Sequence, residues 1–206
     1  MTTRSLAVVS AGLSTPSSTR LLADRLTAAT VDALRERGVG ADVRVVELRE
    51  HARDLADDLV TGFANTSLQA AVDAVTGSDG VIAVTPVFTA SYSGLFKTFF
   101  DVLDKDALAG RPVLVGATAG TARHSLVLDH ALRPLLSYLR AVVVPTGVFA
   151  ASEDWGTGGS APSGALADRI ARAGSELAAL VAGQPAARPA DPFAEPTPFA
   201  QLLAGG

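Results

Sequence analysis

The feature that most constrains this chain is the alternation of short apolar, β-branched runs with longer segments of helical periodicity. Five runs have the length and composition of strands, at residues 6–10, 42–48, 80–85, 112–118 and 141–148. Four of them are almost continuously apolar, as expected of parallel strands that are covered on both faces. The second run alternates polar and apolar residues, which indicates an edge strand with one wetter face.

Segments with helical spacing of apolar residues separate these runs, at residues 18–37, 68–75, 95–103, 125–139 and 165–181. In the first segment Leu22 and Leu26 fall on one face, and Gly38 provides a stop signal. Alternating strands and helices require a parallel sheet with right-handed crossovers and helices on both faces. We therefore predict an α/β fold of the flavodoxin-like, doubly wound class, with a five-stranded parallel sheet of order 2-1-3-4-5.

The length of 206 residues fits a single domain of this kind, which we place at residues 1–184. Residues 185–206 form a Pro/Ala-rich C-terminal tail, which is either disordered or an arm that docks on a neighbouring subunit. Only 18% of the residues are charged, and 48% are hydrophobic. This composition indicates a well-buried core and further surface buried between subunits.

Charge and composition also exclude several classes of protein. A net charge of −4 leaves no strong basic patch for nucleic acid, and the absence of cysteine excludes disulfides, thiolate metal sites and cysteine nucleophiles. No apolar stretch approaches the ~20 residues of a membrane-spanning helix, and the N-terminal apolar run is too short for a secretory signal. The three histidines fit neither a catalytic triad nor a metal site by spacing. We expect a cytoplasmic protein without metal, nucleic-acid or membrane partners.

Ligands of open parallel sheets bind beyond the carboxyl ends of the strands, where the strand order reverses. The first loop at this edge, residues 10–20, is rich in hydroxyl side chains and ends on Arg20 at a predicted helix start. It lacks both the dinucleotide fingerprint and the P-loop motif. Its hydroxyls, guanidinium and helix N-terminus suit a terminal phosphate. The alternative is a helix-capping cluster without a ligand.

Two further loops meet the first at the same edge. The second loop, residues 85–97, offers backbone groups to the edge of a flat polar ring, with Val87 and Phe88 to cover apolar surface. The alternative is an ordinary connection capped by Ser91 or Ser93. The third loop, residues 118–124, has small residues that let a planar ligand approach the backbone closely, and its Arg123 and His124 are within reach of an anion or a substrate carbonyl.

At these loops the chain resembles the NAD(P)H-dependent FMN reductase family of flavodoxin-like flavoproteins. The branch it resembles most serves two-component alkanesulfonate or methanesulfonate monooxygenases. Three segments carry the resemblance: TPVFTASYSGLFK at 85–97, ATAGTARH at 117–124 and LDHALRPLL at 128–136. The similarity extends over roughly residues 5 to 150, and the combined order and spacing of these segments are more specific than any one of them.

The resemblance implies FMN and NAD(P)H as cofactors, with hydride transfer from nicotinamide to flavin N5 and delivery of reduced FMN to a monooxygenase. Such chemistry needs no catalytic acid or base from the protein, because the cofactor carries it. Cofactor-binding residues implied by the resemblance are Ser10, Ser17, Ser18, Thr19 and Arg20 for the phosphate, Pro86, Val87, Phe88, Thr89, Ala90 and Ser91 for the ribityl chain and isoalloxazine, and Thr118, Ala119 and Gly120 for the other ring edge. The alternatives are an NAD(P)H:quinone or azo reductase and a non-enzymatic flavodoxin-like electron carrier.

The resemblance also implies dimers that pair into tetramers, with FMN near the interface. Alkanesulfonate reductases carry a tyrosine in a one-residue π-helical insertion where this chain has His130. Pro134 lacks an N–H and crowds the preceding turn. We therefore predict a helix irregularity at residues 129–133, with His130 near a subunit interface and the flavin. Three phenylalanines occupy both sides of one predicted helix, so we expect part of this set to face a partner: Phe96, Phe99 and Phe100.

Overall fold

The computed structural model describes residues 2–155 and 162–184. The predicted C-terminal tail, residues 185–206, lies outside these ranges. The strands are β1 (Thr3–Ser10), β2 (Gly40–Glu47), β3 (Gly80–Phe88), β4 (Ser91–Tyr92), β5 (Pro112–Ala119), β6 (Val142–Val143) and β7 (Val148–Ala151). The helices are α1 (Ser18–Glu36), α2 (Ala52–Thr61), α3 (Thr66–Thr76), α4 (Gly94–Asp101), α5 (Arg133–Tyr138) and α6 (Gly164–Gly183). Short 3₁₀ turns cover Leu48–His51, Ala122–His124 and Ser152–Asp154, and a π-helical turn covers Leu128–Leu132.

The sheet has the order β2-β1-β3-β5-β6, with β7 also paired to β5, and all these pairs are parallel. This arrangement confirms the predicted flavodoxin-like order 2-1-3-4-5. The predicted fifth strand, residues 141–148, is not continuous but divided into β6 and β7. Pro145 lies between the two pieces and lacks the N–H that a ladder requires. β7 continues beyond the predicted end and carries the chain to Ser152.

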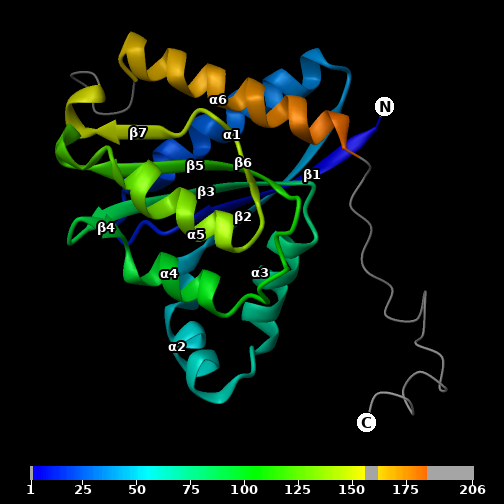
Figure 1. Cartoon of the computed structure of the whole chain (residues 1–206), viewed down its shortest axis with the longest axis vertical. Coiled ribbons are helices and arrows are strands. Elements are labelled where there is room, and N and C mark those ends of the chain that lie inside the picture. The colour runs from blue at the N-terminus through cyan, green and yellow to red at the C-terminus, as the bar shows by residue number, and fades with distance from the viewer. Residues whose placement is uncertain (1, 156–161, 185–206) are drawn as a thin grey trace.

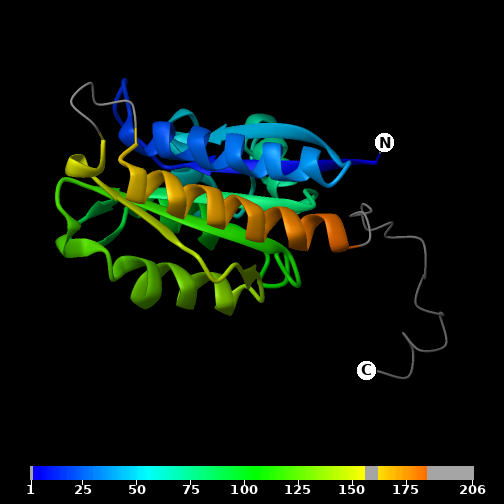
Figure 2. The ribbon, with the colours of Figure 1, turned by 90° about the horizontal axis from the view of Figure 1, so that it is seen from above.

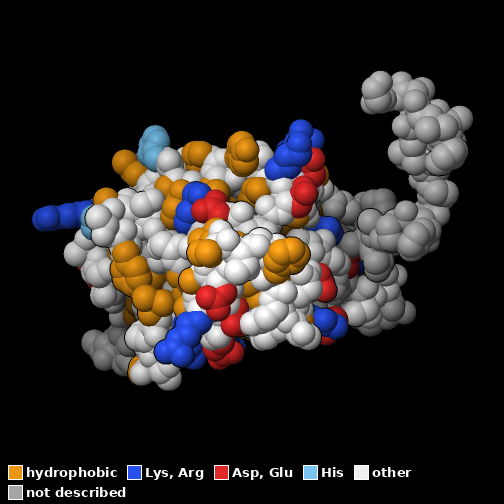
Figure 3. Space-filling model, turned by 90° about the horizontal axis from the view of Figure 1, so that it is seen from below, with side chains coloured by type: hydrophobic (Ala, Val, Ile, Leu, Met, Phe, Trp, Pro, Cys, Tyr) orange, Lys and Arg blue, Asp and Glu red, His pale blue; other side chains and the backbone are white. Residues whose placement is uncertain are grey.

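Two helical layers cover the sheet (Figures 1 and 2). One apolar cluster joins α1 and α6 to one face of the sheet, and a second joins α3, α4 and α5 to the other. Hydrophobic side chains on the face seen in Figure 3 occur in separate groups among charged ones. Of the helices in the described ranges, none is long and apolar enough to cross a membrane.

Helix α2 was not among the predicted helices, although Leu55 and Leu59 recur at helical spacing in its sequence. Leu55 is buried, whereas Leu59 and Val60 are 54% and 86% exposed. The helix begins after a 3₁₀ turn and packs against α4. The contact covers one side of α4, the helix that carries the aromatic residues.

The expectation that the α4 phenylalanines partly face another subunit is wrong. Phe96, Phe99 and Phe100 are at most 2% exposed within the single chain. Their rings pack on one another, with centroids 4.7 Å apart for Phe96 and Phe100 and 5.5 Å for Phe99 and Phe100. Because α4 lies between the sheet and α2, both of its sides are covered from within the chain (Figure 1).

The predicted helix irregularity is confirmed. Residues Leu128–Leu132 form a π-helical turn, in which the amide of Arg133 donates to the carbonyl of Leu128. Pro134 follows in the first turn of α5 and lacks the N–H that would continue the helical hydrogen bonds. His130 is exposed on the single chain. Its place near a subunit interface and the flavin stays a prediction.

Candidate active site

A pocket of about 420 Å³ opens at the carboxyl ends of the strands, where the chain leaves β1, β3, β5 and β7. We call it the strand-end pocket. It lies at the point where the strand order reverses, because β1 feeds α1 while its neighbour β3 feeds α4. No charged side chain is among the residues that line it: Leu13, Ser14, Ser17, Ser18, Thr19, Pro86, Val87, Phe88, Thr118, Ala119, Gly120 and Ser152.

The first loop closes tightly against the start of α1. Ser17 is the N-cap, and its Oγ accepts a hydrogen bond from the amide of Arg20 at 3.2 Å. A Cβ at Gly12 would lie only 2.1 Å from that Oγ, so the loop can approach the helix this closely only with glycine. The amides of Ser18 and Thr19 begin the helix and have no intrahelical acceptor. These two amides are therefore hydrogen-bond donors available to an anion, and they lie at the positive end of the helix dipole.

A buried pair of hydroxyls joins the first loop to the third. Thr19 Oγ1 and Thr118 Oγ1 lie 2.8 Å apart, and both residues are at most 3% exposed. Ser10, the last residue of β1, is fully buried, and its hydroxyl has no hydrogen-bond partner in the structure. Ser10 begins the first loop but does not line the pocket. The bottom of the site is therefore polar and uncharged.

Arg20 points away from the strand-end pocket. Its guanidinium hydrogen-bonds Asp24 at 2.7 Å and also pairs with Glu47 at the end of β2. The hydrogen bond with Asp24, followed by that with Glu47, raises the pKa of Arg20 above its ordinary value although burial lowers it. Arg20 lines a smaller pocket of about 270 Å³ on the outer side of the first loop.

The second loop is a tight hairpin followed by a capped helix. Thr89 and Ala90 have φ values of 50° and 66° and form its turn, and Ser91 pairs with Phe88. Thr89, Ala90 and Ser91 do not line the strand-end pocket. Phe88 does line it, and it is 46% exposed. Of the two predicted caps, Ser93 is the one used, since its Oγ accepts from the amide of Phe96 at 3.2 Å.

The third loop leaves open space at the pocket. A Cβ at Gly120 would meet no atom within 4 Å. Arg123 and His124 are exposed and do not line the strand-end pocket. Sequence reasoning missed Leu13, Ser14 and Ser152 as lining residues. A chain position just past a strand end is the signal that points to Ser152, but the predicted strand stopped at residue 148.

Comparison with known proteins identifies the family. A model of the family "NADPH-dependent FMN reductase" matches residues 4–156. The chain belongs to this family. An FMN reductase (NADPH) of Pseudomonas aeruginosa PAO1 is 42% identical over 147 residues, which cover 71% of this chain and 76% of that protein. The NADH-dependent FMN reductase SfnE of Pseudomonas putida is 36% identical over 180 residues, or 87% of this chain and 94% of that protein.

Solved structures agree with this assignment. An oxidoreductase from Corynebacterium diphtheriae superposes with a TM-score of 0.85 at 54% identity, covering 90% of this chain and 100% of that one. An apo NADH:FMN oxidoreductase, EmoB, has a TM-score of 0.76 at 29% identity and covers 90% of this chain and 94% of that one. The predicted family and fold are therefore confirmed, and the chain is an oxidoreductase, an NAD(P)H-dependent FMN reductase.

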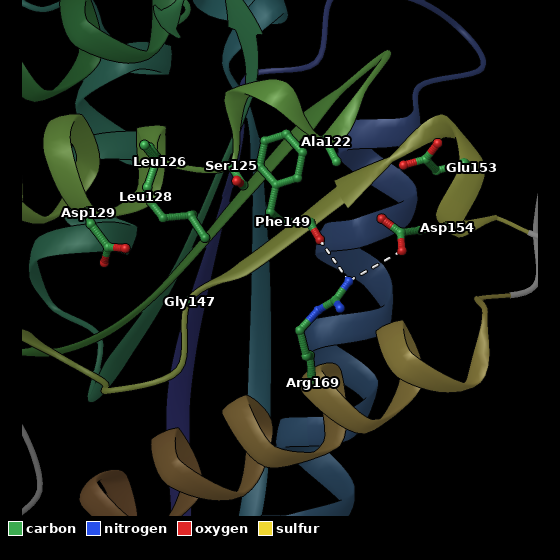
Figure 4. A pocket seen from close by; sticks show the side chains of 10 residues that line it. All are labelled: Ala122, Ser125, Leu126, Leu128, Asp129, Gly147, Phe149, Glu153, Asp154 and Arg169. Atoms are coloured by element: carbon green, nitrogen blue, oxygen red, sulfur yellow. Dashed lines mark hydrogen bonds and ion pairs between the residues drawn. The ribbon is translucent and has the colours of Figure 1, made fainter.

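A second pocket, of about 370 Å³, lies between β7, α6 and the π-helical turn (Figure 4). Its guanidinium, Arg169, donates to the carbonyl of Phe149 at 3.2 Å and lies 3.4 Å from Asp154. Asp129 and Glu153 also line this pocket, but Asp129 lies on its opposite side, with its Oδ1 2.9 Å from Arg133 Nε (Figure 4). Because Arg169 is already paired with Asp154, it offers little free positive charge to a phosphate.

The strand-end pocket fits a phosphorylated flavin better than the second pocket does. It combines free helix amides, hydroxyls and the close approach at Gly12 with the apolar surfaces of Val87 and Phe88. No group of three or more metal-ligating side chains occurs among residues 2–155 and 162–184. The groups that the site offers are thus those that hold and orient a nucleotide cofactor.

Proposed function

We propose that this protein binds FMN in the strand-end pocket, reduces it with NAD(P)H and passes reduced FMN to a separate two-component monooxygenase. The observation that carries the proposal is the uncharged, hydroxyl-lined pocket at the N-terminus of α1, where the first loop approaches the helix closely at Gly12. Relatives named NADH-dependent FMN reductases, SfnE and SfnF of Pseudomonas putida, support the same flavin acceptor. We place the protein in the cytoplasm.

We assign the FMN phosphate to Ser17, Ser18 and Thr19, whose hydroxyls and amides meet at the start of α1. We retain Ser10 and Arg20 in the proposed phosphate site as the two ends of the first loop, residues 10–20, which we call the phosphate loop; neither lines the strand-end pocket. Three groups follow for the rest of the flavin: Pro86, Val87 and Phe88 beside the ribityl chain and ring, Thr89, Ala90 and Ser91 at the hairpin tip, and Thr118, Ala119 and Gly120 along the other ring edge.

Bound FMN supplies the redox chemistry by accepting a hydride from reduced nicotinamide at its N5 atom. The protein's own contribution is to hold the phosphate at fixed donors and to keep one face of the ring open for the nicotinamide. Gly120 leaves that space, and Phe88 provides a half-exposed apolar wall. The site needs no proton donor, and its lining includes no carboxylate, histidine or lysine.

We also propose a homodimer or homotetramer. Exposed apolar residues lie near the two ends of the helical stretch formed by the π-helical turn and α5, whereas the phenylalanines of α4 are buried within the chain. Leu126 is 62% exposed and Tyr138 is 75% exposed, with His130 exposed between them. Burial of these side chains against a second copy would place His130 at the interface.

Steady-state assays with several acceptors test the proposed function. NADH and NADPH oxidation is measured with FMN, FAD, riboflavin and a benzoquinone as acceptors, at one enzyme concentration. We expect FMN to give the highest kcat/KM and to be reduced anaerobically in many equivalents per protein. A quinone preferred over free FMN would make the protein a quinone reductase, and reduction of a single bound equivalent without turnover would make it an electron carrier.

A further inference from the structure

The smaller pocket behind the phosphate loop holds an ion network that the proposed function does not use. We propose that Arg49, held by Glu47, is a positioning residue that fixes the phosphate loop for FMN. This inference rests on the proposed function, because it concerns the same phosphate site. Arg49 lies in the 3₁₀ turn that follows β2, more than thirty residues from the loop it contacts.

Arg49 contacts the loop at two consecutive residues. Its Nη1 donates to the backbone carbonyl of Ser14 at 3.2 Å and to the hydroxyl of Thr15. This part of the loop has little packing of its own, since Leu13, Ser14 and Thr15 are exposed and Leu13 is 54% so. A guanidinium that grips a carbonyl and a hydroxyl together therefore restricts a segment that apolar contacts leave free.

Glu47 in turn fixes Arg49. One carboxylate oxygen of Glu47 lies 3.6 Å from Arg49 Nε, and the other pairs with Arg20 at the start of α1. The Glu47 side chain is only 12% exposed, whereas those of Arg49 and Arg20 are 31% and 36% exposed. A carboxylate at the end of β2 thereby connects the loop to the first turn of the helix it precedes.

The charges of this network cancel. Arg20 and Arg49 carry two positive charges, and Glu47 and Asp24 carry two negative ones. The network therefore adds little net attraction for an anion, and its effect on FMN must come from the position of the loop. Ser14 and Ser17 line both the smaller pocket and the strand-end pocket. A shift of the loop on the side of Arg49 therefore also moves the residues that face the proposed phosphate.

The experiment compares the dissociation constants of FMN and riboflavin for the full chain, by quenching of flavin fluorescence at fixed salt. Because FMN and riboflavin differ only in the phosphate, the ratio of the two constants measures the contribution of the phosphate to binding. The variants are Arg49→Ala, Glu47→Gln and the double variant, with Arg49→Lys as the conservative replacement. The matched control is Arg53→Ala, which removes an exposed arginine from the adjacent turn of α2.

We expect Arg49→Ala and Glu47→Gln each to weaken FMN about tenfold and riboflavin less than about twofold. The double variant is expected to lose about as much as Arg49→Ala alone, because Glu47 acts through Arg49. Arg49→Lys is expected to recover part of the FMN affinity, and Arg53→Ala to retain all of it. A thermal unfolding midpoint for each variant, measured without flavin, shows that the fold is retained.

An FMN-to-riboflavin ratio that stays within about twofold of wild type in Arg49→Ala overturns the inference. So does equal weakening of both flavins, because a general loss of structure acts on both. These results are distinct from failure of the proposed function, in which the wild-type protein itself shows no preference for FMN over riboflavin.

Discussion

Gly12→Ala is the substitution that probes the phosphate loop most directly. The added Cβ would lie 2.1 Å from Ser17 Oγ, 3.1 Å from Ser17 Cβ and 3.2 Å from Thr19 Cβ. Rotation of the Ser17 hydroxyl relieves the first contact only, and it removes the cap hydrogen bond to the amide of Arg20. The two remaining contacts require the loop or the start of α1 to shift by a few tenths of an ångström, and we expect the loop to shift because its residues 13–16 are exposed.

Two magnitudes follow from this geometry. Loss of the N-cap costs about 1 kcal/mol of folding free energy, which lowers the unfolding midpoint of a chain of this size by about 2–4 °C. Displacement of the loop separates the Ser17 hydroxyl from the free amides of Ser18 and Thr19. We expect FMN to bind at least about tenfold more weakly, or about 1.4 kcal/mol, and riboflavin to change by less than about twofold.

The assay is a fluorescence titration of each flavin, paired with a thermal melt. Gly120→Ala is the matched control, because its Cβ meets no protein atom and lies at the proposed ring edge rather than at the phosphate. It is expected to leave the midpoint unchanged and to affect both flavins alike. The reasoning is refuted if Gly12→Ala binds FMN as tightly as the wild type, or if it weakens riboflavin to the same extent.

Three further substitutions test the packing around the site and the sheet, each by urea unfolding. Thr118→Val leaves a buried hydroxyl of α1 without its 2.8 Å partner, so we expect a loss of about 1–3 kcal/mol; an unchanged midpoint would mean that this bond contributes nothing. Gly174→Ala places a Cβ 2.8 Å from the α1 backbone, and we expect a net loss of about 1–2 kcal/mol despite better helix propensity, whereas a gain would show that α1 and α6 can separate. Asp79→Asn removes the carboxylate that lies 3.3 Å from the buried guanidinium of Arg4, and we expect it to lower the free energy of unfolding by about 3–5 kcal/mol. The exposed Asp32→Asn should lower it by less than about 0.5 kcal/mol, and equal losses would contradict the burial of the Arg4–Asp79 pair.

Periodicity predicted most of the fold because the central strands are buried on both faces and the helices bury one side. It failed where the local sequence does not record the tertiary contact. Helix α2 carries Leu55 and Leu59 at helical spacing, but only Leu55 of its large apolar residues is buried, so its sequence does not show that it packs against α4. The same omission explains the error on Phe96, Phe99 and Phe100, since α2 supplies the cover that was assigned to a partner.

The position of the strand-end pocket was predictable from the rule that ligands bind at the carboxyl ends of parallel strands. The identity of the side chains that line it was less predictable. Arg20 follows the hydroxyl-rich loop in sequence, yet Glu47 on the neighbouring strand holds it on the outer side. Ser152 and Arg49 come from elements whose ends or contacts depend on long-range pairing. The helix irregularity at residues 129–133 was predictable because Pro134 disturbs a regular α-helix, and its π-helical form was implied by the family resemblance.

A crystal structure of the protein grown with FMN would locate the flavin. We expect phosphate density within hydrogen-bond distance of the amides of Ser18 and Thr19, with the ring between Phe88 and Gly120. Flavin density in the carboxylate-lined pocket beside Arg169, or a phosphate directed away from the start of α1, would contradict it.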